Sequence, residues 1–200
     1  MLSEFPSFDE VRAGLGDKVI GAVSLSVADA KERLAVYRQT LPDHAAEHSQ
    51  RGLANMINDW LWASIRRSLD PVASVALNDR EPTHEIGVGL EYRLRVKRHR
   101  DGRVRSYPTQ TFLDFQLQGQ QLAFPSMSEV RLNVGYRWDE ETRSISAPVI
   151  SLPHGADVIW HETLESVAPN IKPLRPDADG PQLPVIEVVE DDDAEGTEDR

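Results

Sequence analysis

The period of the hydrophobic pattern changes once along this chain, near Asp70-Pro71, and no other feature limits the fold as strongly. Before that point, apolar residues recur at intervals of three and four, which predicts amphipathic helices. After it, apolar and polar residues alternate, which predicts strands. A chain that places its helices first and its strands afterwards favours the α+β class.

A short helix and two longer ones are predicted before Asp70. Ser7 and Glu10 are spaced as a capping box that opens the short helix. A second helix, over about 27–41, has an apolar stripe of Val27, Ala30, Leu34, Tyr37 and Leu41. Asp43 is placed to cap a third helix over about 44–69, whose apolar face consists of Leu53, Met56, Ile57, Trp60, Leu61, Ile65 and Leu69.

The following segment predicts a sheet with one inserted helix. A short strand covers about 74–77, and a long strand follows with an apolar face of Ile86, Val88, Leu90, Tyr92, Leu94 and Val96. The stretch TQTFLDFQLQ, 109–118, predicts a short helix, and further strands are expected over about 130–138, 143–152 and 157–163. Because the connections are short, we predict N-terminal helices packed on a mainly antiparallel sheet of about six strands.

The C-terminal segment differs from the rest in charge and composition. The chain has a formal net charge of −11, and residues 169–200 contain ten acidic residues against three basic ones, together with five prolines. A segment with this composition buries too little apolar surface to offset the entropy lost on ordering. We therefore predict a single domain over residues 1–168 and a disordered acidic tail over residues 169–200.

The stretch YRLRVKRHRDGRVRSYP, 92–108, contains seven of the 22 Lys and Arg residues and predicts a basic hairpin with Asp101-Gly102 in the turn. A two-residue loop would place Arg100 opposite Arg103, and like charges opposite one another are unfavourable. The sequence therefore favours a three-residue loop, 100–102, with a left-handed Gly102. In this register one outer face carries Arg93, Arg95, Lys97, Arg103 and Arg105.

Three interpretations of this hairpin remain open. Its cations form a surface for nucleic acid or another polyanion, or for an acidic protein partner. Alternatively, they are a solvated face that protects a strand edge from aggregation. The third interpretation is that the tail adds to the ribbon as a strand, through an apolar and acidic motif. That motif comprises Val185, Ile186, Val188, Val189, Asp191, Asp192 and Asp193.

Two patterns suggest metal-dependent chemistry, and each is incomplete. His44 and His48 in HAAEH fit H-x-x-E-H, but this zinc motif needs a third ligand, and no downstream acid on a convincing helix supplies it. The order of elements resembles the PD-(D/E)xK nuclease core, for which Asp79 and Glu91 are available. However, the expected third core strand, RVRSYP, contains no acid.

Other candidate residues have ordinary structural explanations. Ser144, Ser146 and Ser151 lie in a strand pattern without a nucleophile elbow. Gly87 and Gly89 are not followed by a helix, as a phosphate-binding loop requires, and instead predict a strand bend. The sequence thus predicts no catalytic residue, no metal and no cofactor, and it favours a protein that is not an enzyme.

The sequence has no Cys, which excludes disulfides and thiolate zinc sites and suits a reducing cytosol. The N-terminus lacks the basic start and apolar run of a signal peptide. No apolar run reaches the length of about 18 residues that spans a bilayer. We therefore expect a cytoplasmic protein without a membrane partner.

Several runs together resemble a group of uncharacterised actinobacterial and phage-associated proteins of similar length. They are NMINDWLWASIRRSLD, NDREPTHEI, YRLRVKRHRDGRVRSYPTQTFLDF and VRLNVGYRWDEETRSISAPVISLP. Members are encoded beside a helix-turn-helix protein that carries an ImmA/IrrE-type metallopeptidase domain. The resemblance implies a protein partner in a toxin–antitoxin-like or prophage-like regulatory pair, and it assigns no catalytic residue.

Taken together, the sequence favours a cytoplasmic interaction protein that acts with a protein partner in a regulatory pair. The alternative is a nucleic-acid-binding or nuclease-like effector that uses the basic hairpin, with a metal-dependent nuclease as the main enzymatic form. Nucleic acid therefore remains a second expected class of partner.

Overall fold

The computed structural model describes residues 5–80, 83–104, 106, 109–118 and 129–165. The chain divides into two compact units, Met1–Pro169 and Asn170–Arg200, and the described residues all belong to the first. That unit has N-terminal helices packed on a mixed sheet, as expected for the α+β class. None of the described helices is long and apolar enough to cross a membrane.

The first helix, α1, covers Phe8–Thr40 and is longer than predicted. The capping box at its start is confirmed, since the Ser7 side chain accepts from the Glu10 backbone and the Glu10 carboxylate accepts from the Ser7 backbone. The predicted short helix is the first part of α1, since the backbone leaves the helical conformation at Gly16 (φ 77°) and a second helical part follows directly. Glycine reaches this conformation at low cost, so the two helical parts join across a kink and the second begins earlier than predicted.

The predicted third helix is two helices in the structure. Helix α2 covers Pro42–Glu47, and α3 covers Gln50–Leu69, with the Ser49 side chain capping α3 through the Gly52 backbone. Asp43 was expected to cap the third helix. It lies inside α2 instead, because Pro42 at the first helical position starts that helix two residues earlier than predicted.

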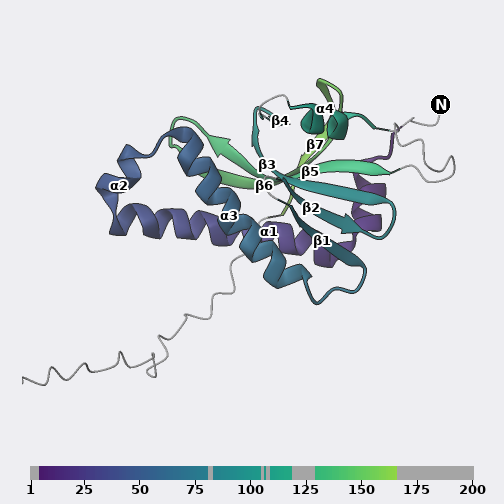
Figure 1. The fold of residues 1–200 in the computed structure, drawn as a ribbon, viewed down its shortest axis with the longest axis horizontal. Coiled ribbons are helices and arrows are strands. Elements are labelled where there is room, and N and C mark those ends of the chain that lie inside the picture. The colour runs from purple at the N-terminus through teal and green to yellow at the C-terminus, as the bar shows by residue number, and fades with distance from the viewer. Residues whose placement is uncertain (1–4, 81–82, 105, 107–108, 119–128, 166–200) are drawn as a thin grey trace, which may run out of the picture. The chain divides into compact units, whose positions relative to one another are not determined.

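Within the described residues the sheet contains seven strands, six of them in the order β1-β2-β3-β5-β6-β7 and the seventh, β4, paired to β3 (Figure 1). Their bounds are β1 Val75–Arg80, β2 Thr83–Val88, β3 Tyr92–Arg100, β4 Arg103–Val104, β5 Val130–Asp139, β6 Ser144–His154 and β7 Asp157–Thr163. The predicted long strand is wrong, since the chain turns at Gly89 (φ 56°) and pairs β2 antiparallel with β3. The turn exposes Leu90 instead of burying it with the other apolar residues.

One pair of neighbouring strands, β3 and β5, is parallel, and every other pair in the described sheet is antiparallel. The predicted inserted helix, α4 (Gln110–Gln116), is confirmed and lies between these two strands in the sequence. At their seam, a Cβ on Gly135 would lie 2.1 Å from the Lys97 carbonyl oxygen. The close backbone contact therefore requires glycine at this position of β5.

The two faces of the sheet are covered by different helices. The even-numbered positions of β3 and β5, such as Leu94 and Val134, pack in one core with α1 and α3. The odd-numbered positions face α4, whose Phe115 is buried under the guanidinium of Arg95. Since successive side chains of a strand point to opposite faces, this alternation decides where each charged residue of β3 lies.

Candidate functional site

The cations predicted to form one row lie on two faces of the sheet. Arg93, Arg95 and Lys97 are odd-numbered positions of β3 and lie on the α4 face. Arg103 pairs with Arg100 in the β3–β4 ladder and therefore shares the face of the even-numbered positions. Arg105 lies outside the described residues. The expectation of a single outer row is wrong.

The row is divided because the hairpin loop has two residues, not three. The described ladder pairs His99 with Val104 and Arg100 with Arg103, so Asp101 and Gly102 alone form the turn. Both have positive φ, 50° and 74°, which is the signature of the type I′ turn that Asp-Gly favours. The like charges opposite one another are tolerated because Arg100 forms an ion pair with Glu140 at 3.1 Å, and Arg103 is exposed.

On the α4 face, the arginines of β3 are matched by groups within the domain. Arg95 forms an ion pair with Glu85 at 3.1 Å, and its guanidinium carbon lies 3.9 Å from the centre of the Phe115 ring. Arg93 lies 3.5 Å from the carboxylate of Glu129, which also binds Arg131 at 2.9 Å. These guanidinium groups are therefore occupied in the folded domain.

Lys97 is the half-buried cation of the same face. Its ammonium lies 5.9 Å from the centre of the Phe112 ring. Burial lowers the pKa of Lys97, and the charge of Arg95 lowers it further. A lysine with this environment is a poor contact for the regularly spaced phosphates of a duplex, because its charge is partly enclosed by protein.

The tail motif, Val185, Ile186, Val188, Val189, Asp191, Asp192 and Asp193, lies outside the described residues. Its docking on the basic hairpin stays a prediction. The same holds for the predicted disorder of residues 169–200.

The two metal-dependent patterns are not assembled by the described residues. His44 is exposed on α2, while His48 lies beyond the end of that helix with Nε2 2.9 Å from the Tyr37 hydroxyl oxygen. Asp79 accepts hydrogen bonds from Trp62 Nε1 and Arg66, both at 3.0 Å, and so has a structural role at the edge of the sheet. In the part of the chain described, no three His, Cys, Asp or Glu residues form a group able to hold a metal ion.

One serine of the β6 strand pattern has a histidine partner in the structure. Ser151 Oγ lies 3.0 Å from His99 Nε2, and both residues are almost fully buried on the α4 face of the sheet. Burial lowers the pKa of His99 to about 4, with further lowering from His161 and Arg137. The pair is neutral at physiological pH and enclosed, which fits a packing role and leaves no room for a substrate.

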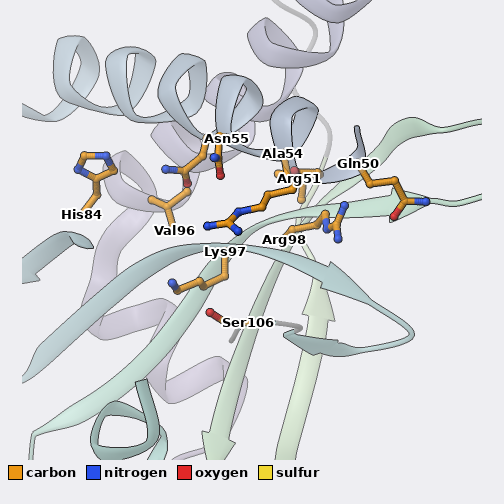
Figure 2. Close-up of a pocket in the computed structure, with 11 residues that line it drawn as sticks. Gln50, Arg51, Ala54, Asn55, His84, Val96, Lys97, Arg98 and Ser106 are labelled. Atoms are coloured by element: carbon orange, nitrogen blue, oxygen red, sulfur yellow. The ribbon is translucent and has the colours of Figure 1, made fainter. Parts of the chain in front are cut away.

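A cleft of about 580 Å³ lies on the opposite face, between the N-terminal half of α3 and the sheet (Figure 2). Figure 2 shows Arg51 and Asn55 extending from α3 toward β3, while Gln50 and Arg98 lie at one end of the cleft. The volume is in the range of small-molecule and side-chain binding sites. The lining consists of Gln50, Arg51, Ala54, Asn55, Asn58, His84, Val96, Lys97, Arg98, Ser106 and Tyr136. The Lys97 side chain extends from β3 to the side away from α3, where it lies beside Phe112 (Figure 2).

The lining of this cleft is cationic and polar, and the described lining contains no carboxylate. Arg51 and Arg98 take part in no ion pair among the described residues, unlike Arg93, Arg95 and Arg131 on the α4 face. The first turn of α3 adds the positive end of a 20-residue helix at the Gln50 end. The arrangement is therefore complementary to an anion.

Most of this cleft was not predicted from the sequence. Arg98 lies in the predicted hairpin but outside its predicted row of cations, and Arg51, Asn55 and Tyr136 were not among the predicted site residues. A usable signal was present, because Arg51, Asn55 and Asn58 are spaced by four and three along a helix whose apolar face is elsewhere. The pattern alone did not show which strand would lie opposite this polar stripe.

Comparison of the chain with protein-family models, with curated proteins and with solved structures finds no match. The resemblance to actinobacterial and phage-associated proteins thus stays a prediction. The function is therefore inferred from the geometry and charge of the described residues.

Proposed function

We propose that this protein is a cytoplasmic interaction protein that acts with a protein partner in a regulatory pair, and that acidic side chains of the partner bind at the cleft between α3 and the sheet. One observation carries the proposal. Arg51 and Arg98 have no carboxylate partner among the described residues, whereas Arg93, Arg95 and Arg131 on the α4 face are each paired with a carboxylate of the domain.

Two further features support an acidic protein surface over nucleic acid as the ligand. Duplex DNA presents phosphates at regular intervals, so it is best bound by a long row of free cations. In this domain the row is divided between two faces, and Arg93 and Arg95 are already neutralised. Two guanidinium groups that line one cleft instead fit one or two carboxylates, which arginine binds through two parallel hydrogen bonds.

The proposal is tested by purifying the tagged chain from its natural host with its bound partners. Two charge-reversed variants with the same change in net charge are compared with the unmodified chain. The cleft variant is Arg51→Glu/Arg98→Glu, and the control is Lys18→Glu/Lys31→Glu, at two exposed positions of α1. Circular dichroism and thermal melting confirm that both variants fold.

We expect the unmodified chain and the α1 control to retain the same protein partner, and the cleft variant to lose it. Since exposed ion pairs are screened by salt, the partner should also elute at high ionic strength. Equal retention by the cleft variant contradicts the proposal. Retention of nuclease-sensitive nucleic acid that depends on Arg51 and Arg98 supports the nucleic-acid-binding alternative instead.

A further inference from the structure

One residue of the cleft lining has a buried hydrogen-bond donor without an acceptor among the described residues. Tyr136 lines the cleft and is only 2% exposed, and its hydroxyl oxygen is buried with no hydrogen-bond partner among the described residues. Buried polar atoms are almost always paired, and an unpaired one destabilises a folded protein. An unpaired donor that borders a cleft is therefore well placed to meet a ligand.

The Tyr136 hydroxyl remains a donor over the physiological pH range. Burial raises its pKa strongly, and the positive charge of Arg98 opposes this only in part. Arg98 is the cross-strand neighbour of Tyr136 in the parallel β3–β5 pair, so the two side chains emerge on the same face of the sheet. The hydroxyl and the guanidinium therefore belong to neighbouring residues on one face of the sheet, and both residues line the cleft.

The opposite wall supplies more donors. Asn55 and Asn58 are one turn apart on α3 and both line the cleft, as does Arg51. The side-chain amides have two N–H donors each, and no described hydrogen bond occupies them. Ala54 and Val96 are the apolar side chains among the described lining, so the site is built for polar contacts.

We propose that this cleft is a binding site for a single oxyanion, a carboxylate or a phosphate, whose oxygens accept hydrogen bonds from the Tyr136 hydroxyl and from the guanidinium groups of Arg98 and Arg51. A cation is disfavoured because no carboxylate is present in the described lining. Guanidinium groups match the geometry of carboxylate and phosphate oxygens, and the tyrosine hydroxyl adds a directed third donor.

This inference shares with the proposed function only the cleft between α3 and the sheet. The oxyanion can belong to an Asp or Glu side chain of a partner protein, or to a free small molecule such as a phosphate ester. The ligand chemistry is shared by these two sources, so it can be measured without the partner.

The experiment titrates the purified full chain with sodium phosphate, sodium acetate and an Asp/Glu-rich peptide, each at constant ionic strength against sodium chloride. Side-chain amide signals of Asn55 and Asn58 and the Nε signal of Arg98 are followed by NMR. We expect saturable shifts with dissociation constants on the order of millimolar for a lone anion. Tyr136→Phe should weaken binding about tenfold, because a hydrogen bond to a charged group is lost.

Tyr92→Phe is the matched control, because Tyr92 is a partly buried tyrosine that does not line the cleft. It should bind the anions as the unmodified chain does, and Arg98→Gln should abolish the saturable shifts. Linear shifts equal to those in sodium chloride overturn the inference, as does undiminished binding by Tyr136→Phe. Saturable binding of phosphate and acetate without binding of the peptide supports the oxyanion site and counts against the proposed partner contact.

The inference and the proposed function can fail separately. Loss of the partner on reversing Arg51 and Arg98, without saturable anion binding at Tyr136, leaves the partner contact standing and removes the oxyanion site. If the unmodified chain binds anions saturably but the cleft variant still retains the partner, the oxyanion site stands and the partner contact at the cleft is removed.

Discussion

Protonation of His99 should make the stability of the domain depend on pH between about 4 and 6.5. His99 is 1% exposed and contacts Ser151, and burial lowers its pKa from 6.5 to about 4. In this interval the unfolded chain binds a proton that the folded domain does not. Stability therefore rises with pH here, is fully present above 6.5, and is lost as pH falls toward 4.

The size of the effect follows from the two pKa values. A difference of this size corresponds to about 3 kcal/mol over the full interval. Between pH 7.5 and pH 5.5 the loss is about 1 kcal/mol, because only part of the unfolded population is protonated at the upper pH. Limiting the measurement to pH 5.5 avoids most of the carboxylate titrations that occur at lower pH.

The assay is urea unfolding at both pH values for the unmodified chain, His99→Gln and a control, His44→Gln, at an exposed position of α2. We expect the unmodified chain and the control to lose about 1 kcal/mol more than His99→Gln between the two pH values. Equal losses in all three proteins refute the reasoning. If His99→Gln fails to fold, an NMR titration of His99 in the unmodified chain decides, since its ring signals should not change between pH 7.5 and 5.5.

Four further predictions concern stability and are tested by the same unfolding assay. Tyr136→Phe should stabilise the anion-free domain by about 1 kcal/mol, because it removes a buried hydroxyl without a partner, and destabilisation would show that the hydroxyl is satisfied. Gly135→Ala should cost more than about 3 kcal/mol or prevent folding, since its Cβ would meet the backbone of β3 at 2.1 Å. By contrast, Gly21→Ala in α1, where a Cβ meets nothing within 4 Å, should stabilise by up to about 1 kcal/mol. Ser7→Ala should cost about 1 kcal/mol through loss of the capping box with Glu10, and an unchanged midpoint would contradict that role.

The element types were largely predictable because they depend on local periodicity. The apolar residues from Val27 to Leu34 recur at helical spacing, and those of β5 alternate with polar ones. In each segment one period therefore decides between helix and strand. Thr109 and the pattern after it likewise indicated α4. The prediction failed at Gly89, where the alternation of apolar and polar residues continues from β2 into β3 across a turn. Alternation cannot show whether a strand continues or turns back on itself.

The hairpin register and the strand order depend on interactions that the local pattern does not contain. The two-residue turn was disfavoured because Arg100 and Arg103 repel, but Glu140 from a distant segment neutralises one of them. The parallel pairing of β3 with β5 depends on backbone contact at Gly135, which is far from β3 in the sequence. The cleft was missed for the same reason, since Arg51 and Tyr136 meet only after the sheet has assembled.

Both ends of α1 are held by segments that are translated at least 105 residues later. Trp160 Nε1 donates to the Pro6 carbonyl at 2.9 Å, and the Trp160 ring packs edge-on against Phe8. At the other end, Arg38 donates to the carbonyl of Arg143, next to β6. During translation α3 follows α1 closely and can cover part of its apolar side, but the part that packs on β6 remains available to chaperones until that strand leaves the exit tunnel. Translation that stalls after β5 would yield a nascent chain prone to aggregation.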